Sequence, residues 1–466
     1  MMNILFSPQT YRQRREALKS KINNGLILFL GHTESPMNYP ANAYSFRQNS
    51  SFLYFFGLNL PDLAAVIDTE TGEEILFGDD FTIDDIIWMG DQPKTADLAE
   101  KVDVKKTFPL NKLSDFLKQN ASRTIHFLPP YRAESVLTLS RLLQISTEEV
   151  KSKVSVELIK AVVALRSVKS EEEILEMEKA CTVGAVMQNT VMHLCAEGQT
   201  EQFLYSVMTG IASQYGNGTS FPVILSQHGE ILHNHDHSGV LKNENLLLVD
   251  SGCQIHSFYC SDHTRTLPIG GKFTQKQKEI YEIVLAAKEQ SIAQIQPGRF
   301  YKDIHLNAAK IIAEGLKNLG LMKGCMDEAV AAGAHALFFP HGLGHQVGLD
   351  VHDMEDLGEN YVGYDEQVQR ATVFGLSGLR MARQLKPGFT ISVEPGIYFI
   401  PKLIEQWRAE HKFQDFINYD RLESYLDFGG IRIEDCVAVT ENGARVLGTH
   451  LAETVAELES AIGQPL

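Results

Sequence analysis

One stretch of thirteen residues restricts the structure of this chain more than any other. It runs from His341 to Asp353 (HGLGHQVGLDVHD) and contains three histidines and three glycines. A zinc-protease helix would carry His-Glu-x-x-His, but here Gly342 and Gly344 lie between the first two histidines, and each glycine destabilises a helix by ~1 kcal/mol relative to alanine. We therefore expect a turn or an irregular strand whose backbone passes close to another group. A glycine loop with incidental histidines is the alternative.

The length of the chain predicts more than one domain. Its 466 residues exceed the ~250–300 at which a single core stops growing, and we place the domains at 1–165 and 166–466. The hydrophobic content of 44% and charged content of 22% are typical of a soluble globular protein. A net charge of −17 argues against nucleic acid and anionic membranes as partners, because both attract basic patches.

The compartment is predicted from cysteines and apolar segments. The six cysteines contain no Cys-x-x-Cys pair, which fits reduced thiols. No apolar stretch of signal length precedes the charged N-terminal run, and no segment approaches ~18 consecutive apolar residues. We expect a cytoplasmic protein.

The first domain has the pattern of an α/β fold. Residues 25–30 (GLILFL) form a short apolar run typical of a buried strand, and residues 64–68 and 73–77 flank a glycine turn typical of a hairpin. The aromatic stretch 45–57 favours a core or a subunit interface over a ligand site. Nucleotide-binding glycine motifs are absent from this half of the sequence.

The second domain alternates helical and strand-like segments. Ser170 and Thr274 each begin a capping box, the first completed by Glu173 and the second by Gln277, and both precede amphipathic helices. A third helix is expected over 302–319. The whole chain is therefore predicted to be a mixed α/β (α+β) protein.

Two acidic residues lie on one predicted hairpin. Residues 246–250 (LLLVD) read as a buried strand ending in Asp250, and Asp262 begins an alternating segment that puts Thr264 and Thr266 on its own face. The residues between are numerous enough to turn the chain and bring Asp262 near Asp250. A buried aspartate requires a cation or several donors.

Two further acids repeat this arrangement. Glu394 follows the strand-like segment 391–393 and Glu434 follows 431–433, each on the face opposite to apolar side chains. Taken singly, such acids usually lie on a solvated outer face. Taken together, four carboxylates and one histidine would neutralise two divalent cations, with manganese favoured and cobalt or zinc as alternatives. Such a pair activates water for hydrolysis.

These residues resemble those of the pita-bread metallopeptidases, the family of aminopeptidase P and prolidase. The ordered set Asp250, Asp262, His345, Glu394 and Glu434 matches the five metal ligands of that family. The stretch FRQNSSF at 46–52 also resembles the N-terminal domain shared by aminopeptidase P and prolidase. The resemblance thus implies a C-terminal pita-bread catalytic domain. It also implies that Asp262 and Glu434 bridge two metals, that Asp250 completes one, and that His345 with Glu394 completes the other.

The resemblance also assigns roles near the substrate. His352 matches a family histidine that contacts the substrate, and His233 matches one associated with substrate positioning and proton transfer, although an exposed loop is the alternative for its histidine-rich tract. Glu394 resembles the general base. We assign His341 to the surroundings of the substrate and to support of a ligand histidine.

Two features favour prolidase over aminopeptidase P. Arg380 matches the prolidase arginine that binds the free carboxylate of a dipeptide, a task suited to a guanidinium; a surface salt bridge is the alternative. The insertion from about 400 to 428 also resembles prolidase. In contrast, the interval from Asp250 to Asp262 is one residue longer than usual in the family, and we expect a β-bulge to absorb it.

The predicted function is hydrolysis of Xaa-Pro bonds in proline-containing di- or oligopeptides by a dinuclear metal centre. A catalytically inactive pita-bread binding module and a methionine aminopeptidase are the alternatives, the second disfavoured by the large N-terminal domain. The resemblance implies a homodimer, with a tetramer as the alternative. The N-terminal domain is expected to serve substrate access or oligomerisation.

Overall fold

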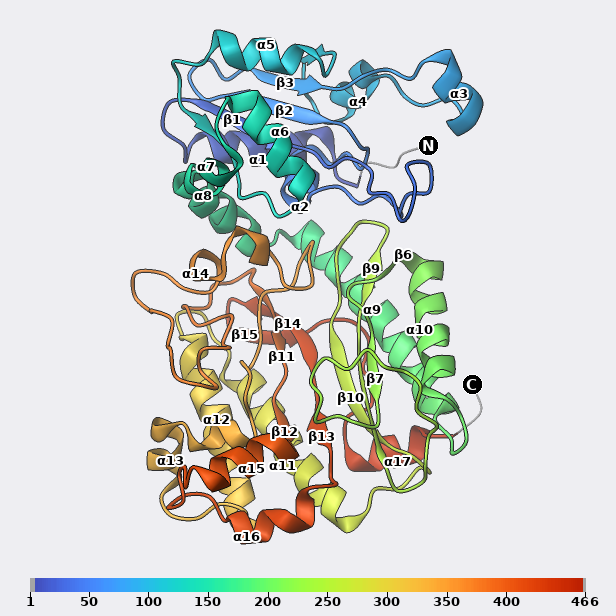
Figure 1. Ribbon diagram of the computed structural model, residues 1–466, viewed down its shortest axis with the longest axis vertical. Coiled ribbons are helices and arrows are strands. Elements are labelled where there is room, and N and C mark those ends of the chain that lie inside the picture. Colours follow the sequence, from blue (N-terminus) through green and yellow to red (C-terminus); the bar gives the residue numbers. More distant parts are fainter. Residues whose placement is uncertain (1–4, 464–466) are drawn as a thin grey trace. The chain divides into compact units, whose positions relative to one another are not determined.

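The protein is described by a computed structural model that covers residues 5–463 (Figure 1). Residues 1–4, which the signal-sequence argument included, lie outside the described part. The chain divides into two compact units, of which unit 1 comprises Met1–Arg166 with Met354–Tyr361 and unit 2 the remainder. Among the described residues, no helix is both long and apolar enough to cross a membrane.

Unit 1 is built on a five-stranded sheet in the order β4-β3-β2-β1-β5. The strands are β1 (Leu26–Leu30), β2 (Ala64–Asp68), β3 (Glu74–Phe77), β4 (Lys106–Phe108) and β5 (Ile125–His126). The helices are α1 (Pro8–Lys19), α2 (Ser50–Phe56), α3 (Ile83–Met89), α4 (Thr95–Lys101), α5 (Lys112–Gln119), α6 (Ala133–Leu143), α7 (Thr147–Ser152) and α8 (Val156–Ser167), with η2 (Glu355–Leu357) and most of α14 (Glu359–Val362). The predicted strand at 25–30 is β1, which pairs on both edges.

The aromatic stretch of unit 1 forms part of its core, as predicted. Every residue of α2 is buried. Asn49 caps the helix by accepting from the backbone N–H groups of Ser51 and Phe52, and Gly57 ends it with a φ of 65°. The predicted hairpin is also confirmed, because β2 and β3 pair antiparallel around Gly72, which has a φ of 77°.

Unit 2 combines short sheets with long helices. Its strands are β6 (Gly216–Thr219), β7 (Ile224–Ser226), β8 (Leu246–Ser251), β9 (Cys253–Ile255), β10 (His263–Pro268), β11 (Thr390–Val393), β12 (Gly396–Tyr398), β13 (Gly430–Arg432), β14 (Asp435–Thr440) and β15 (Gly443–Val446). Its helices are α9 (Glu171–Leu194), α10 (Glu201–Tyr215), α11 (Gln275–Gln294), α12 (Tyr301–Asn318), α13 (Met326–Ala332), α15 (Pro401–Ala409), α16 (Tyr419–Leu422) and α17 (Val455–Ala461), with η1 (Ala334–Leu337) and η3 (Glu423–Tyr425).

Two helix pairs of unit 2 pack on different strands. Helix α9 packs against α10 and against β8, β9 and β10, whereas α11 packs against α12 and against β11, β12, β13 and β15 (Figure 1). Both predicted capping boxes are present, at Ser170 on α9 and at Thr274 on α11. The predicted third helix is α12. The insertion near 400–428 contains α15, α16 and η3.

The hairpin from β8 to β10 corrects one expectation. The pairing runs in one register from Leu246 opposite Pro268 to Ser251 opposite His263, and it continues at the bridge between Gln254 and Cys260. The β-bulge that we expected between the two acids is therefore not there. The hairpin takes up its length in a three-residue turn at 256–258, which ends at Phe258 with a φ of 70°.

Candidate metal centre

One cavity of unit 2 gathers the predicted functional residues. Its volume is about 500 Å³. The nine residues singled out from the sequence all line it: His233, Asp250, Asp262, His341, His345, His352, Arg380, Glu394 and Glu434. The remaining lining is partly apolar, with Phe221, Pro222, Ile224, Leu232 and Val351, and partly polar, with His235 and Arg432.

The β8–β10 register brings the two aspartates to one face. Asp250 lies opposite Thr264, and side chains of directly paired residues share a face of a sheet. Asp262 precedes Thr264 by two positions and therefore projects to the same side. Both aspartates are buried, with 7% of Asp250 and 5% of Asp262 exposed.

The two glutamates come from neighbouring strand ends. Glu394 directly follows β11, and its backbone N–H donates to the carbonyl of Leu343 at 2.8 Å. Glu434 lies between β13 and β14, where its N–H donates to the carbonyl of Thr264 at 3.0 Å. The Thr264 hydroxyl donates to Glu434 Oε2 at 2.7 Å. Since Glu434 is 2% exposed, the solvated outer face that is usual for a single acid does not apply here.

The stretch 341–345 runs as irregular extended chain beside β11, as its glycines predicted. The N–H of His345 donates to Ser392 Oγ at 3.1 Å, and the N–H of Ser392 donates back to the carbonyl of His345 at 2.9 Å. A Cβ atom on Gly344 would lie 2.1 Å from the carbonyl oxygen of Ser392. Only glycine therefore fits at this crossing.

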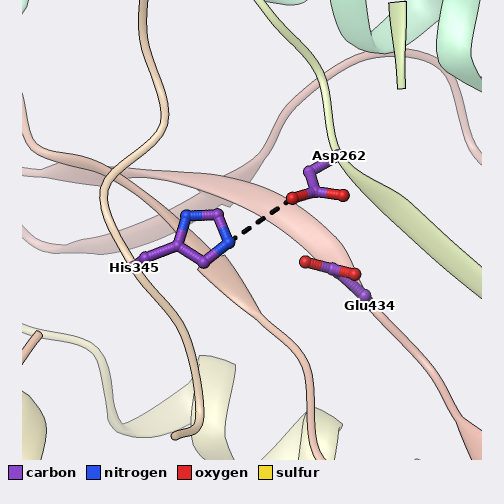
Figure 2. Close-up of side chains that lie close together, drawn as sticks. All are labelled: Asp262, His345 and Glu434. Atoms are coloured by element: carbon purple, nitrogen blue, oxygen red, sulfur yellow. Dashed lines mark ion pairs between the residues drawn. The ribbon is translucent and has the colours of Figure 1, made fainter. Parts of the chain in front are cut away.

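Three side chains converge in the middle of the cavity. Asp262, His345 and Glu434 point toward one another in Figure 2, and one potential ligand atom of each lies within 4.8 Å of the others. His345 Nε2 lies 3.4 Å from Asp262 Oδ2 and 3.5 Å from Glu394 Oε1. Two ligand atoms bonded at ~2.1 Å to one ion lie ~3.0–3.5 Å apart. The spacing therefore suits atoms that share a cation.

Three buried carboxylate oxygens of the cavity residues have no hydrogen-bond partner among the described residues. They are Oδ1 of Asp250, Oδ1 of Asp262 and Oε1 of Glu434. Burial of a charged oxygen without a partner is costly, so each requires a cation or a proton. Burial raises the pKa of Asp262 and of Glu434 well above the usual range, and the surrounding carboxylates raise both further. Burial also raises the pKa of Glu394, against the opposing effect of His345. An excess of buried negative charge is what divalent cations would neutralise.

Comparison with known proteins decides the family. The model described as metallopeptidase family M24 matches residues 176–441, and the model described as the aminopeptidase P N-terminal domain matches residues 11–126. The chain belongs to metallopeptidase family M24.

Relatives in this family match nearly the full length of the chain. It is similar to the Xaa-Pro dipeptidase of Homo sapiens, with 31% identity over 453 residues that cover 95% of this chain and 89% of the relative. It is also similar to the Xaa-Pro aminopeptidase of Escherichia coli strain K12, with 29% identity over 469 residues that cover 97% of each.

Solved structures agree. Zinc-substituted E. coli aminopeptidase P in complex with product superposes with a TM-score of 0.81 at 28% identity, covering 98% of both chains. Pseudomonas aeruginosa aminopeptidase PepP superposes with a TM-score of 0.81 at 26% identity, and the match covers 99% of both chains. The predicted resemblance and the predicted mixed fold, an N-terminal domain followed by a pita-bread domain, are confirmed. Membership in M24 makes the protein a metallopeptidase that uses divalent metal ions, and the buried donor set fits such ions.

The remaining predicted residues of this M24 protein lie around the three central side chains. The ring of His352 lies 4.1 Å from that of His345, centroid to centroid. Nε2 of His341 forms a hydrogen bond with the Tyr398 hydroxyl at 2.8 Å. Nδ1 of the same ring lies 3.8 Å from Glu394 Oε2. Nδ1 of His345 lies 3.0 Å from the carbonyl oxygen of Gln346, and this contact orients the ring.

His233 and Arg380 also line the cavity. Burial lowers the pKa of His233, and the positive charges of Arg432 and Arg380 lower it further, whereas Asp250 opposes the shift. The imidazole is therefore neutral near neutral pH. The histidine-rich tract around it is mixed, because His237 is buried while His228 is 70% exposed in its side chain.

Sequence reasoning gave no role to Arg432 and Tyr398. The Arg432 guanidinium, 3% exposed, donates to Asp250 Oδ2 at 2.5 Å and to the Tyr398 hydroxyl at 2.8 Å. It also donates through Nε to the hydroxyl of Thr264 at 3.2 Å. A signal for Arg432 was available, because alternation places it on the face of Glu434. Nothing comparable marks Tyr398, whose contact is made only by the folded chain.

Proposed function

We propose that this M24 peptidase hydrolyses the bond between an N-terminal residue and a following proline. The observation that carries the proposal is the convergence of four buried carboxylates and His345 in one cavity, in a chain whose full-length relatives are named Xaa-Pro aminopeptidase and Xaa-Pro dipeptidase. The apolar wall formed by Phe221, Ile224 and Leu232 suits a proline ring or an apolar side chain.

The proposed ligands are the five residues of the motif. Asp262 and Glu434 would hold both ions, Asp250 would complete one site, and His345 with Glu394 the other. When bound, divalent ions supply Lewis-acid chemistry that lowers the pKa of water and polarises a carbonyl. Oxygen-rich ligation with one imidazole favours manganese over cobalt and zinc.

The protein side chains handle the protons. Glu394, which lines the cavity, accepts the proton of the attacking water. Its Oε1 lies 3.3 Å from the hydroxyl of Ser392, which fixes the carboxylate for this transfer. The Xaa-Pro bond is a tertiary amide without an N–H, so the proline nitrogen must receive a proton as it leaves. Glu394 can return the proton it took.

Two histidines of the cavity wall orient the substrate. His233, neutral near pH 7, offers one N–H donor to a peptide carbonyl while its other nitrogen accepts. His352 lies against His345 and would contact the substrate next to the scissile bond. Both roles remain proposals based on their place in the cavity.

The test is metal dependence combined with removal of the base. Chelator should abolish release of proline from an Xaa-Pro peptide, and manganese should restore it. Glu394→Gln should lower kcat by roughly 100-fold or more, because a general base typically contributes about 100- to 10,000-fold. Full hydrolysis by Glu394→Gln would refute the mechanism.

We infer a slight preference for dipeptides, which Arg380 supports because its guanidinium lines the cavity and could bind a free carboxylate. Rates on an Xaa-Pro dipeptide should exceed those on Xaa-Pro-Yaa tripeptides, and Arg380→Ala should remove the difference mainly by raising KM for the dipeptide. Equal rates of the unmodified enzyme on both substrates would exclude this preference.

A further inference from the structure

A buried ion pair joins Lys169 to Asp353, the last residue of the stretch 341–353 in unit 2. Lys169 Nζ lies 2.9 Å from Asp353 Oδ2, and the side chains of both residues are only 2% exposed. A buried ion pair is seldom more stable than a well-packed apolar pair, because both charges must leave water. Its presence therefore suggests that it holds a backbone segment in place.

The pair closes the end of the loop that carries His352. The N–H of Asp353 donates to the carbonyl of Gln346 at 2.9 Å, and Asp353 Oδ1 accepts from the N–H of Asp350 at 3.4 Å. His352 directly precedes the aspartate. A shift of Asp353 would therefore move His352 within the cavity.

The beginning of the same loop is anchored in another way. The N–H of Val347 donates to the carbonyl of Thr390 at 3.0 Å, and the Thr390 hydroxyl donates back to the carbonyl of Val347 at 2.6 Å. Cys260 donates its N–H to the carbonyl of Gly348 at 2.8 Å. These bonds hold His345 and its neighbours to β11 and to the segment that precedes β10, without the ion pair. Removal of the ion pair should thus displace the end of the loop more than its beginning.

Lys169 is itself held firmly. Its N–H donates to the carbonyl of Gly388 at 2.8 Å, two residues before β11, and it immediately precedes Ser170, the N-cap of α9. The backbone of Lys169 is therefore a fixed point from which its side chain reaches the loop.

We propose that the Lys169–Asp353 pair is a positioning device for His352. It acts through the placement of the imidazole and leaves the metal ligands in position. This inference rests on the proposed function, in which His352 contacts the substrate.

The test removes both charges together, because a single neutral partner would leave a buried charge that could prevent folding. The variant Lys169→Met with Asp353→Asn retains the shape of both side chains and the backbone N–H bond to Gln346. We expect kcat for an Xaa-Pro peptide to fall roughly 10–100-fold, the effect usual for residues that orient active-site groups. Metal bound per chain should be unchanged. The matched control is Lys402→Met with Glu405→Gln, which removes an exposed pair at 2.8 Å and should leave kcat unchanged.

Coupling to His352→Ala separates positioning from general damage. If the pair acts through His352, its removal in the His352→Ala background should cost less than about twofold in kcat, because the effects of residues that act as a unit are not additive. An undiminished loss in that background, loss of bound metal in the double variant, or a double variant within twofold of the unmodified enzyme would each overturn the proposal. An unmodified protein that binds metal and cleaves no Xaa-Pro peptide would instead refute the proposed function itself.

Discussion

At the residue scale, one close approach determines the geometry of the cavity. Gly344 passes so near β11 that a Cβ atom would meet the backbone oxygen of Ser392, which is not a group that can turn away. The two residues that flank this crossing, His345 and Glu394, both have their N–H groups bonded across it. The crossing therefore positions one proposed ligand on each strand.

Gly344→Ala should consequently destabilise the fold and the metal centre together. Overpacking against backbone costs typically ~1–3 kcal/mol, and here the displaced atoms carry His345 and Glu394. Thermal unfolding and metal content of the purified variant check this, with both expected to fall.

Gly210→Ala provides the matched control. Gly210 lies inside α10, and an added Cβ would have nothing within 4 Å. Alanine should therefore stabilise this helix by ~0.5–1 kcal/mol and leave metal content unchanged. Equal behaviour of the two variants would contradict the argument from the close approach.

At the element scale, the strands that carry the acids could be predicted from the sequence. The way in which these strands pair could be predicted only in part. The apolar run before Asp250 and the alternation after Asp262 predicted β8 and β10, and the register confirms that both acids share a face. The predicted β-bulge was wrong, because a three-residue turn accommodates the interval from Asp250 to Asp262 without a change of register. Turn geometry depends on backbone conformations such as the positive φ of Phe258. An aromatic residue at that position does not predict a positive φ from the sequence.

Other parts of the site required the folded chain. Single-strand statistics favoured a solvated face for Glu434, and only the set of acids indicated a buried centre. The bonds from Arg432 to Tyr398 and Asp250 join three separate strands, which no local pattern specifies. Helix α12 and η1 likewise bury two histidines, His305 and His335, that the sequence did not single out.

The packing of α12 on η1 should make the protein sensitive to acid. Burial lowers the pKa of His305 to about 3 and of His335 to about 4. Between these values and the ordinary ~6.5, the unfolded chain binds more protons than the native protein, so the free energy of unfolding decreases as pH falls. The stability that these groups contribute is complete above pH ~6.5 and is lost progressively below it.

His305→Phe should reduce this loss. Neither ring nitrogen of His305 has a hydrogen-bond partner among the described residues, so little is removed with the imidazole. Urea unfolding of chelator-treated protein at pH 7.5 and pH 5.5 should show that the unmodified protein loses about 1 kcal/mol more than the variant. The same loss in both proteins would mean that His305 is protonated when folded.

At the scale of the whole molecule, the described chain forms two units with different contents. Unit 2 holds the cavity and every proposed ligand, and unit 1 holds a sheet with the aromatic core of α2. The sequence divided the chain at 165, whereas the contacts assign Met354–Tyr361 to unit 1, a grouping that depends on tertiary contacts and leaves no mark in the local pattern. We propose that unit 1 serves substrate access or oligomerisation.

The assembly and the compartment remain predictions of the same kind. All six cysteines are free thiols. We expect a homodimer, and light scattering on the purified protein should give twice the chain mass of 52.0 kDa. A monomer at working concentrations would exclude the oligomerisation role of unit 1, and four chain masses would indicate the tetramer.

The central claim is that two metal ions in the cavity of unit 2 make this chain an Xaa-Pro peptidase. It is tested most directly by adding manganese stepwise to chelator-treated protein while measuring proline-bond cleavage in an Xaa-Pro dipeptide and an Xaa-Pro-Yaa tripeptide. We predict no cleavage without metal, a rise with each addition, and a plateau at two equivalents per chain. Cleavage in the presence of chelator, or none of either peptide at any manganese concentration, would contradict the claim.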